Sequence, residues 1–501
     1  MSESKPSAAA NQAAPQAASS GIAVSDFEKL LQQEFKPKSE EANTAVQGAV
    51  NVLVEQALQN ANLVSGDSIK TIESMIAELD KKLSAQVNEI IHHPDFTELE
   101  SAWRGLDYLV SHTETSESLK IRVLNVSKND LSKSFKKFKG SSWDQSPLFK
   151  KIYEDEYGTA GGEPFGALIG NYYFNQSAPD IEVLKGMAQI AAAAHAPFIA
   201  AAAPAMFNLD SWQDLSKPRD LTKIFSTPEY AAWRSFRETD DSRYVALTLP
   251  RVLSRMPYGP DTNPVEGFAF VEDTSDGDSS HYVWMNAAYT MGVNINRSFA
   301  DYGWCAHIRG VESGGVVADL PTHTFPTDDG GMAMKCPTEI AITDRREAEL
   351  SQNGFLPLCY WKNTDYAVFL GGQTVNKPQE YDNADATANA VLSARLPYIF
   401  ASSRFAHYLK CIVRDKIGSF KERADMQNWL SDWISNYVTS DPNASEEIKA
   451  KYPLAEARVE VDEIEGQPGY YNARFYLRPH YQLEGLTTSL RLTAKVPSGA
   501  S

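Results

Sequence analysis

The sequence predicts an α+β protein, a mixed α/β fold with helices near its N-terminus and antiparallel strands at its C-terminus. Apolar residues before residue 95 recur at helical spacing, whereas those after Ala455 alternate with charged residues as in strands. Helical and strand-like patterns are mixed between these two regions. Of the 501 residues, 43% are hydrophobic and 22% are charged, which is typical of a folded protein of roughly two to four domains.

Changes of pattern divide the chain into five expected parts. Residues 1–25 are rich in Ala, Gln, Pro and Ser and bury too little apolar surface to offset their ordering entropy, so we expect disorder there. The remaining parts are an N-terminal helical region at 26–95, a middle mixed α/β domain at 96–335, a domain with the C-terminal strands at 336–496, and a short polar tail at 497–501.

One long amphipathic helix is predicted before His92-His93-Pro94, because proline cannot continue a helix. Its apolar residues are spaced three or four apart, close to the pattern of a coiled coil. This stripe, which we call the seam, consists of Ile69, Ile72, Ile76, Leu79, Leu83, Val87 and Ile90. An apolar stripe needs a covering surface, which could be the protein's own body or a second protein.

The middle of the chain predicts strands and two loops. Leu119 to Val126 alternates like a strand, and the apolar run from Ile190 to Pro204 is typical of a strand buried on both faces. Proline, glycine and aspartate dominate Pro257 to Ser280 and Pro326 to Gly331, which we interpret as loops.

The region after Cys336 combines further strands with two helices. Short strands are predicted at Thr338–Thr343, Leu356–Trp361 and Tyr366–Leu370, and helices at Asp385–Gly418, with a break at Pro397, and at Glu422–Val438. Asp344 suits the N-cap of another helix.

Alternating segments end the chain. In Ala455–Ile464 the residues Ala457, Val459 and Val461 share one face, while charged residues occupy the other. A turn at 466–469 leads to a second strand at 471–477, and a third is predicted at 486–496.

Charge and cysteine content narrow the partners and the compartment. Lys and Arg number 47 and Asp and Glu 65, so the net charge is −18, which argues against nucleic acid or an anionic membrane as the main partner. Cys305, Cys336, Cys359 and Cys411 form no C-x-x-C pair, and we interpret them as buried thiols in a reducing compartment. No signal peptide or membrane-spanning segment is recognisable, so we expect a cytoplasmic protein without membrane insertion.

Motifs for catalysis are missing from the sequence. It holds no phosphate-binding P-loop, dinucleotide fingerprint, H-E-x-x-H or G-x-S-x-G pattern. His195, in an apolar run, could act as a base, but a hydrogen-bonded core histidine is the favoured interpretation, and the same holds for His407. The pair Glu272-Asp273 lies in an expected loop, where solvated charge is the default. We therefore expect no catalytic residue, cofactor or metal, and an interaction protein rather than an enzyme.

Several long motifs resemble a known family. They are Gly162–Gly170 (GEPFGALIG), Ala194–Ala200 (AHAPFIA), Arg297–Cys305 (RSFADYGWC), Cys336–Glu347 (CPTEIAITDRRE), Ser393–Tyr398 (SARLPY), Arg404–Tyr408 (RFAHY), Arg414–Phe420 (RDKIGSF) and Leu477–Leu486 (LRPHYQLEGL). With them the chain closely resembles the large subunit of the bacterial type VI secretion contractile sheath, the TssC or VipB family. The first sixty residues carry little of this signal.

The resemblance implies a contractile-sheath fold and a mechanical function. Family members pair with a small sheath subunit, TssB or VipA, and the heterodimers polymerise helically around an inner tube of Hcp on a baseplate. The sheath then contracts and propels the tube into a target cell, and a ClpV ATPase, acting through the small subunit, disassembles it. The domain at 96–335 would lie in the middle or outer layer and that at 336–496 in the inner layer.

The resemblance also suggests roles for three groups of residues. The seam would bind the small subunit. The start of the last long helix would contact the inner tube through Lys421, Glu422, Arg423 and Asp425, although a plain solvated helix start explains these charges equally well. Neighbouring subunits would be joined by exchanged strands containing Arg474, Phe475, Leu477, Leu486, Leu490 and Leu492. An ordinary internal strand is the alternative for this last group.

Two other classes of protein stay open from the sequence. A phage-type tail sheath or capsid-like shell would form tubes from this chain alone. A hydrolase or other enzyme would have a deep cleft with convergent titratable groups and would lose turnover when His195 is changed.

Overall fold

The computed structural model describes residues 44, 48, 68–217, 220–274, 279–326, 330–416, 422–464, 471–480 and 482. The chain falls into two compact units. The first comprises Met1–Gln86 with Gly267–Phe270, and the second comprises Val87–Glu266 with Val271–Ser501. The elements described below belong to the second unit, apart from the greater part of helix α3.

Two consecutive helices begin the described chain. Helix α3 covers Ser68–Ile91, as the seam predicts, and α4 covers Pro94–Ser111. Pro94 stops α3 and also starts α4, because a proline at the first helical position lacks only an N–H that the helix would leave unused. The ring of His93 caps α4 by accepting the backbone N–H of Asp95 at 3.3 Å. The mixed α/β region expected from residue 96 therefore starts with a helix.

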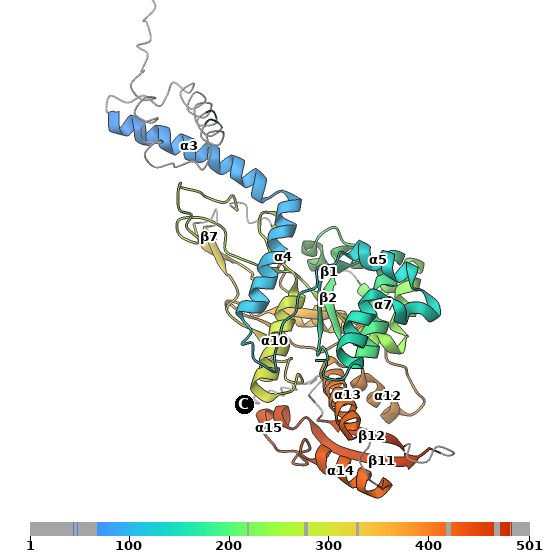
Figure 1. Ribbon diagram of the computed structural model, residues 1–501. Helices are drawn as coiled ribbons and strands as arrows, with labels where there is room; N and C mark the ends of the chain where they lie inside the picture. The colour runs from blue at the N-terminus through green and yellow to red at the C-terminus, as the bar shows by residue number, and fades with distance from the viewer. Residues whose placement is uncertain are drawn as a thin grey trace, which may run out of the picture. The chain divides into compact units, whose positions relative to one another are not determined.

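A six-stranded sheet forms the centre of the second unit (Figure 1). Its order is β1-β2-β3-β9-β10-β6, with β1 at one edge. The strands are β1 Leu168–Phe174, β2 Phe198–Ala202, β3 Val245–Leu249, β9 Leu356–Tyr360, β10 Ala367–Phe369 and β6 Val316–Val317. Strands β1, β2, β3 and β9 run parallel, and β10 pairs antiparallel with both β9 and β6.

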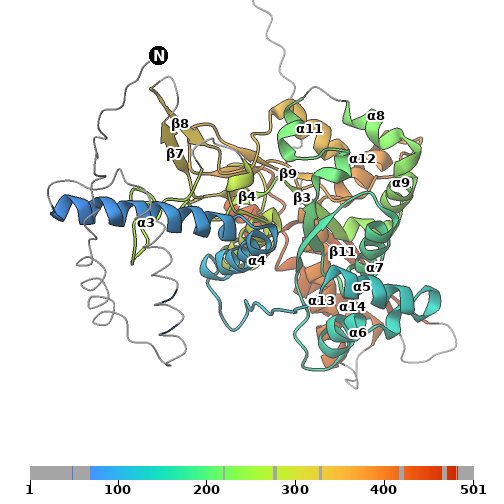
Figure 2. The same cartoon turned by 90° about the horizontal axis from the view of Figure 1, so that it is seen from above.

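Helices cover both faces of this sheet (Figures 1 and 2). On one face lie α5 (Lys128–Lys137), α7 (Ala178–Ala194) and α9 (Ala231–Arg237), and on the other lie α4 and α10 (Ala287–Tyr302). Alternate residues of β2 point to opposite faces, so Phe198, Ala200 and Ala202 belong to the first core and Ile199 to the second. Burial on both faces explains the uninterrupted apolar sequence of this strand.

Three sequence-based expectations in this region are wrong. The apolar run from Ile190 is divided: its first part completes α7, His195 adopts the left-handed conformation at φ 51°, and only Phe198–Ala202 is a strand. The run is rich in alanine, which favours a helix, and a pattern that counts only apolar residues does not distinguish alanine from residues that favour strands. Residues 119–126 form no regular secondary structure and pair with no strand among the described residues. Thr338–Thr343 is not a strand either, since only Thr338 forms an isolated bridge, with Val252.

The C-terminal elements follow the sequence more closely. The predicted long helix is broken just before Pro397 into α12 (Ala384–Ser393) and α13 (Leu396–Lys416), and α14 covers Arg423–Ser435. Helix α11 (Asp344–Gln352) starts where Asp344 suggested, although Thr343 occupies the N-cap position. Strands β9 and β10 confirm two short predicted strands, and both pair within the central sheet although they follow residue 335.

The remaining elements are short and connect the larger ones. The short helices are α6 (Pro147–Phe149), α8 (Leu221–Ser226) and α15 (Glu446–Lys451), and the short strands are β4 (Val252–Leu253), β5 (Trp284–Met285), β7 (His323–Pro326) and β8 (Met332–Lys335). The 3₁₀-helices are η2 (Gly140–Gln145), η4 (Pro204–Phe207), η5 (Trp212–Ser216), η6 (Pro228–Tyr230), η7 (Asp240–Tyr244) and η8 (Ser279–His281). The π-helix is η3 (Lys150–Gly158). None of the described helices is long and apolar enough to cross a membrane.

Candidate functional site

A C-terminal hairpin provides the first candidate assembly surface. Strands β11 (Leu454–Glu463) and β12 (Tyr471–Pro479) pair antiparallel, with Val459 opposite Phe475 and Val461 opposite Ala473. The alternation read from the sequence is confirmed, because Val459 and Val461 are buried against Leu430 of α14. The apolar face of the hairpin is thus covered by its own chain.

Charged residues occupy the other face of the hairpin. Arg474 pairs with Asp462 at 3.4 Å and Arg478 with Glu456 at 3.0 Å, both between the two strands. The Tyr476 hydroxyl donates to Glu460 at 3.2 Å. Exposed ion pairs of this kind add little stability, typically about 0–1 kcal/mol. They keep this face polar.

The two outer edges of the hairpin are mostly open. Within the described part of the chain, no strand pairs with the outer edge of β12, and β11 is bonded on its outer side only at Leu454, whose N–H and C=O contact Tyr437 and Thr439. Open edges of a two-stranded sheet can accept a strand through main-chain hydrogen bonds. This arrangement suits strand exchange between subunits.

The structure describes only some of the residues that are expected to take part in strand exchange. Arg474, Phe475 and Leu477 lie in β12, where they are paired with this chain's own β11. Leu486, Leu490 and Leu492 lie outside the described residues, as does the predicted turn at 466–469.

The expected tube-contact residues lie at the start of α14. Glu422, Arg423 and Asp425 are exposed there, and Lys421 lies outside the described residues. Glu422 is in the N-cap position without a side-chain cap bond, so its carboxylate is available to another partner. Charged side chains at this helix start are therefore displayed to solvent, as both interpretations of the sequence require.

The seam lies along α3 and is only partly covered. Ile76 is 49% exposed and Ile90 is 52% exposed, while Leu79, Leu83 and Val87 are half-buried. The helix positions of Ile69 and Ile72 are described, but their side chains are not. Of the seam side chains that the structure describes, none is fully buried, so the stripe remains available as a contact surface.

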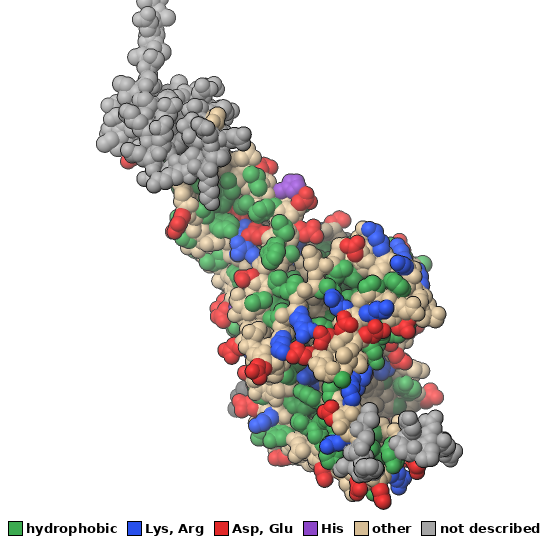
Figure 3. Space-filling view, viewed as in Figure 1, with side chains coloured by type: hydrophobic (Ala, Val, Ile, Leu, Met, Phe, Trp, Pro, Cys, Tyr) green, Lys and Arg blue, Asp and Glu red, His purple; other side chains and the backbone are tan. Residues whose placement is uncertain are grey.

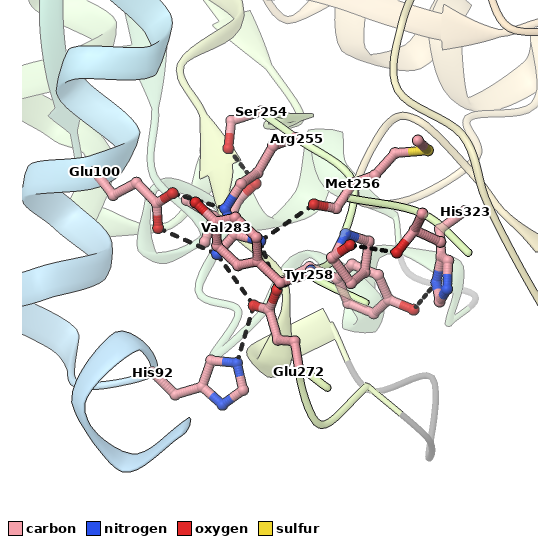
Figure 4. A network of polar contacts seen from close by, with 12 residues as sticks. His92, Glu100, Ser254, Arg255, Met256, Tyr258, Glu272, Val283 and His323 are labelled. Atoms are coloured by element: carbon pink, nitrogen blue, oxygen red, sulfur yellow. Dashed lines mark hydrogen bonds and ion pairs between the residues drawn. The ribbon is translucent and has the colours of Figure 1, made fainter. Parts of the chain in front are cut away.

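A buried ionic network, which the sequence did not predict, joins α4 to the loop after β4 (Figure 4). Arg255 contacts Glu272 at 2.6 Å and Glu100 of α4 at 2.6 Å. Glu272 also accepts the backbone N–H of Tyr258 at 2.8 Å and lies 3.2 Å from the ring of His92. The expectation that Glu272 is solvated is wrong, since its side chain is 1% exposed. Its charge is compensated by an arginine 17 residues away in the sequence.

Charge compensation also sets the protonation of this network. Burial alone would raise the pKa of Glu100, but hydrogen bonds from Arg255 and Arg104 hold that pKa below its ordinary value. Burial likewise disfavours the charged form of Arg255, yet its two carboxylate partners raise the pKa of this guanidinium. Glu100 and Arg255 are therefore both charged at neutral pH.

The histidines proposed as possible bases have structural contacts. His195 lies 3.2 Å from the Tyr244 hydroxyl, and His407 donates to the backbone carbonyl of Ala194 at 2.8 Å. Burial lowers the pKa of His407 to about 4 and also lowers that of His195. The interpretation as a hydrogen-bonded core histidine is confirmed for His407, while His195 is hydrogen-bonded but only half-buried.

Among the residues that the structure describes, the cysteines and the other metal-binding side chains form no further site. Burial raises the pKa of Cys305 to about 11 and that of Cys359 to about 12, which disfavours the nucleophilic thiolate of both at neutral pH. Cys336 and Cys411 are half-buried rather than buried as expected. Among the residues that the structure describes, no three His, Cys, Asp or Glu side chains could hold a metal ion together.

A second feature missed by the sequence reasoning is a cavity of about 870 Å³ beside β1. Helices α4 and α10 and the segment 117–126 border it. Leu99 and Trp103, one helical turn apart on α4, are both exposed and line it. That apolar pair at i, i+4 spacing is the signal that could have indicated the site from the sequence.

An open-edged hairpin, a partly covered helical seam and the absence of assembled catalytic groups among the described residues are typical of an assembly protein. Two sequence families match the chain: one described as EvpB/VC_A0108, tail sheath N-terminal domain, over residues 73–376, and one described as EvpB/VC_A0108, tail sheath gpW/gp25-like domain, over residues 385–496. The chain belongs to this family of type VI secretion tail sheath proteins. The resemblance read from the motifs is thereby confirmed.

A curated relative matches almost the whole chain. It is the type VI secretion system sheath protein TssC1 of Pseudomonas aeruginosa, which is 66% identical over 476 residues, covering 95% of this chain and 96% of the relative.

Solved contractile-injection structures are more distant. The anti-feeding prophage baseplate gives a TM-score of 0.36 at 10% identity, covering 78% of this chain and 86% of that chain. The contracted PVC sheath complex of an extracellular contractile injection system gives 0.34 at 10% identity, covering 62% and 68%.

Proposed function

We propose that this chain is the large subunit of a type VI secretion contractile sheath, which pairs with a small subunit, polymerises around an inner tube and contracts to propel that tube into a target cell. The observation that carries the proposal is the near-full-length similarity to a sheath protein of that system. The sheath works in the cytoplasm, on a baseplate, and an ATPase of the ClpV type recycles it through the small subunit.

The hairpin β11–β12 supports joining of neighbouring subunits by exchanged strands. Main-chain hydrogen bonds do not depend on side-chain packing, so a strand added to an open edge stays bound while the surrounding contacts rearrange. The predicted strand at 486–496 follows β12 along the chain and is the segment that we propose is exchanged. Contraction then changes the packing of subunits without separating them, as a bistable assembly requires.

The seam and the start of α14 supply the other two contacts. The seam on α3 binds the small subunit through apolar burial, worth about 25 cal/mol for each Å² removed from water. Exposed charges at Glu422, Arg423 and Asp425 face the inner tube. Charge contacts suit a surface that must slide, because they tolerate changes of position better than packed apolar side chains do.

Catalysis forms no part of the proposed function. His195 and His407, the candidate bases, are engaged in hydrogen bonds within the fold, and burial lowers the pKa of each. The energy of contraction resides in two packings of one subunit rather than in a reaction.

Co-expression of the chain with its small subunit tests the proposal. Negative-stain microscopy of the purified material should show long tubes with a cogwheel cross-section. Tubes formed by this chain alone would favour the phage-type sheath. A monodisperse monomer in the presence of the small subunit would contradict a sheath function.

A further inference from the structure

A small cavity lies between the end of α5 and α7, on the face of the central sheet away from α4 and α10. Its volume is about 180 Å³, and we call it the lysine hollow. Its lining includes the apolar side chains of Phe138, Trp143 and Ile190 and the charged side chains of Lys139 and Lys185. The two aromatic side chains are half-buried and the two lysines are exposed. A partner that enters the hollow therefore meets aromatic rings and ammonium groups together.

Lysines outnumber carboxylates around the lysine hollow. Lys139 contacts Glu182 at 3.0 Å, and this hydrogen bond, together with the charges of Lys136 and Lys185, holds the pKa of Glu182 below its ordinary value. Within the described part of the chain, neither Lys136 nor Lys185 forms an ion pair of its own. Figure 3 shows Lys and Arg side chains gathered over the position of α5, although the whole chain carries a net charge of −18. An acidic partner would compensate this local excess of positive charge.

A segment at the start of α12 has the opposite character. Residues 379–385 (QEYDNAD) are all exposed, and we call them the acidic loop. Tyr381 is 48% exposed and lies between Glu380 and Asp382. None of the three acidic side chains of this loop forms an ion pair with a described residue. Tyrosine is enriched at protein interfaces, and the flanking carboxylates give this tyrosine a charge opposite to that of the lysine hollow.

Hydrogen bonds fix the backbone of the acidic loop. The N–H of Tyr381 donates to the Thr387 hydroxyl at 2.8 Å, and that hydroxyl donates to the carbonyl of Tyr381 at 3.0 Å. Asn383 caps α12 by accepting the N–H of Asp385 at 2.8 Å. A loop that is already ordered loses little conformational entropy when it binds, so Tyr381 is presented to a partner at low cost.

The acidic loop and the lysine hollow lie at separate places on the second unit. Figures 1 and 2 both show α12, whose start belongs to the acidic loop, apart from α5. The loop therefore does not fill the hollow of its own chain. Two different complementary surfaces on one chain make a heterologous contact, which repeats from copy to copy and builds a ring or an open helix. A second copy of this chain is therefore the favoured occupant.

We propose that the lysine hollow of one copy binds the acidic loop of a neighbouring copy in the polymer. Tyr381 enters the hollow and packs on its aromatic lining, while Glu380 and Asp382 face Lys136 and Lys185. The proposal rests on the proposed function, because helical polymerisation is what brings the copies together.

Charge reversal with rescue tests the contact in the co-expressed heterodimer. Lys136→Glu combined with Lys185→Glu should leave the heterodimer soluble but reduce the number of tubes seen by negative-stain microscopy at least tenfold. Adding Glu380→Lys and Asp382→Lys should restore tube formation, because opposite charges then face each other again.

A matched control makes the same change of charge outside the lysine hollow. It is Lys150→Glu combined with Lys151→Glu, at two exposed lysines that do not line the cavity, and it should form as many tubes as wild type. Three results would overturn the proposal: normal tube formation by the Lys136 and Lys185 variant, an equal loss in the control, or no recovery in the fourfold variant.

Photo-crosslinking in assembled sheaths gives an independent test and decides if a charge variant is insoluble. A photoreactive benzoylphenylalanine replaces Gln189, an exposed residue that lines the hollow, or the exposed Val311 outside it as a control. The Gln189 crosslink should link two large subunits, and mass spectrometry should locate it in residues 379–385. It should be missing from free heterodimers and from the control. Crosslinks from Gln189 to the small subunit, to the inner tube or to no peptide would contradict the proposal.

The two proposals can fail separately. Tubes that form while Gln189 crosslinks elsewhere would refute the contact and leave the sheath function intact. No tubes from the wild-type chain and its small subunit would count against the sheath function itself and, with it, against the contact.

Discussion

Replacing Arg255 with Met should strongly destabilise the second unit. The substitution keeps the approximate length of the side chain but removes the charge that compensates Glu272, whose side chain is 1% exposed. Glu100 loses its 2.6 Å contact with Arg255 but keeps its contact with Arg104 at 2.6 Å. Removing one partner of a buried pair costs about 3–5 kcal/mol, because the other charge is left uncompensated, so we expect a loss of that size.

A matched double variant separates charge from packing. In Arg255→Met with Glu272→Gln, no uncompensated charge is buried, and the amide oxygen can still accept the N–H of Tyr258. We therefore expect the double variant to recover part of the stability lost in the single variant. The measurement is urea unfolding of the purified heterodimer, followed by tryptophan fluorescence.

The pH dependence provides a further check on the network. The pKa of Glu100 is lowered in the folded protein, so its ionised form contributes stability at pH values above its unfolded pKa. That contribution is lost as the pH falls through the lowered, folded pKa. Removing Arg255 takes away part of it, so the difference between wild type and Arg255→Met should shrink in acid. A single variant within about 1 kcal/mol of wild type at neutral pH, or a double variant no better than the single, would refute this reasoning.

Three further predictions concern assembly. Ile76→Asp combined with Leu83→Asp places charges in the seam and should abolish co-purification with the small subunit or leave the chain insoluble, whereas equal yield would show that the seam is not the interface. Charge reversal at Lys421 and Arg423 should leave the heterodimer intact but impair polymerisation on tubes, and unaltered secretion would count against a tube contact. Deletion of 486–501 should spare a soluble heterodimer with a native circular dichroism spectrum while abolishing long sheaths. If full-length tubes still form, strand exchange by this segment is excluded.

Local patterns predicted many elements well. The seam predicted α3 because the spacing of its apolar residues is helical over more than twenty positions, and Pro94 marked the boundary. Alternation predicted β11 and the buried face that contains Val459. In these elements the periodicity of the residues and the burial imposed by the fold agree.

Sequence patterns gave wrong predictions where the same kind of sequence suits two different local structures. The apolar run from Ile190 suits a buried helix as well as a buried strand, and the reversal at His195 has no signature in the sequence. Residues 119–126 alternate as a strand does, but the strand at their side is absent from the described chain. Alternation of residue types along the sequence cannot report whether a neighbouring strand is present.

The sequence alone determined the mixed fold class, the seam, the C-terminal hairpin and, through its motifs, the sheath family. These depend on periodicity and on contiguous residues, which can be read along the chain. Only the tertiary structure brought Glu100, Arg255 and Glu272 together and placed the cavity beside β1 between segments more than a hundred residues apart. The physical reason is that compensation of a buried charge and the space beside a sheet edge depend on distances across the fold, and residue order does not encode those distances locally.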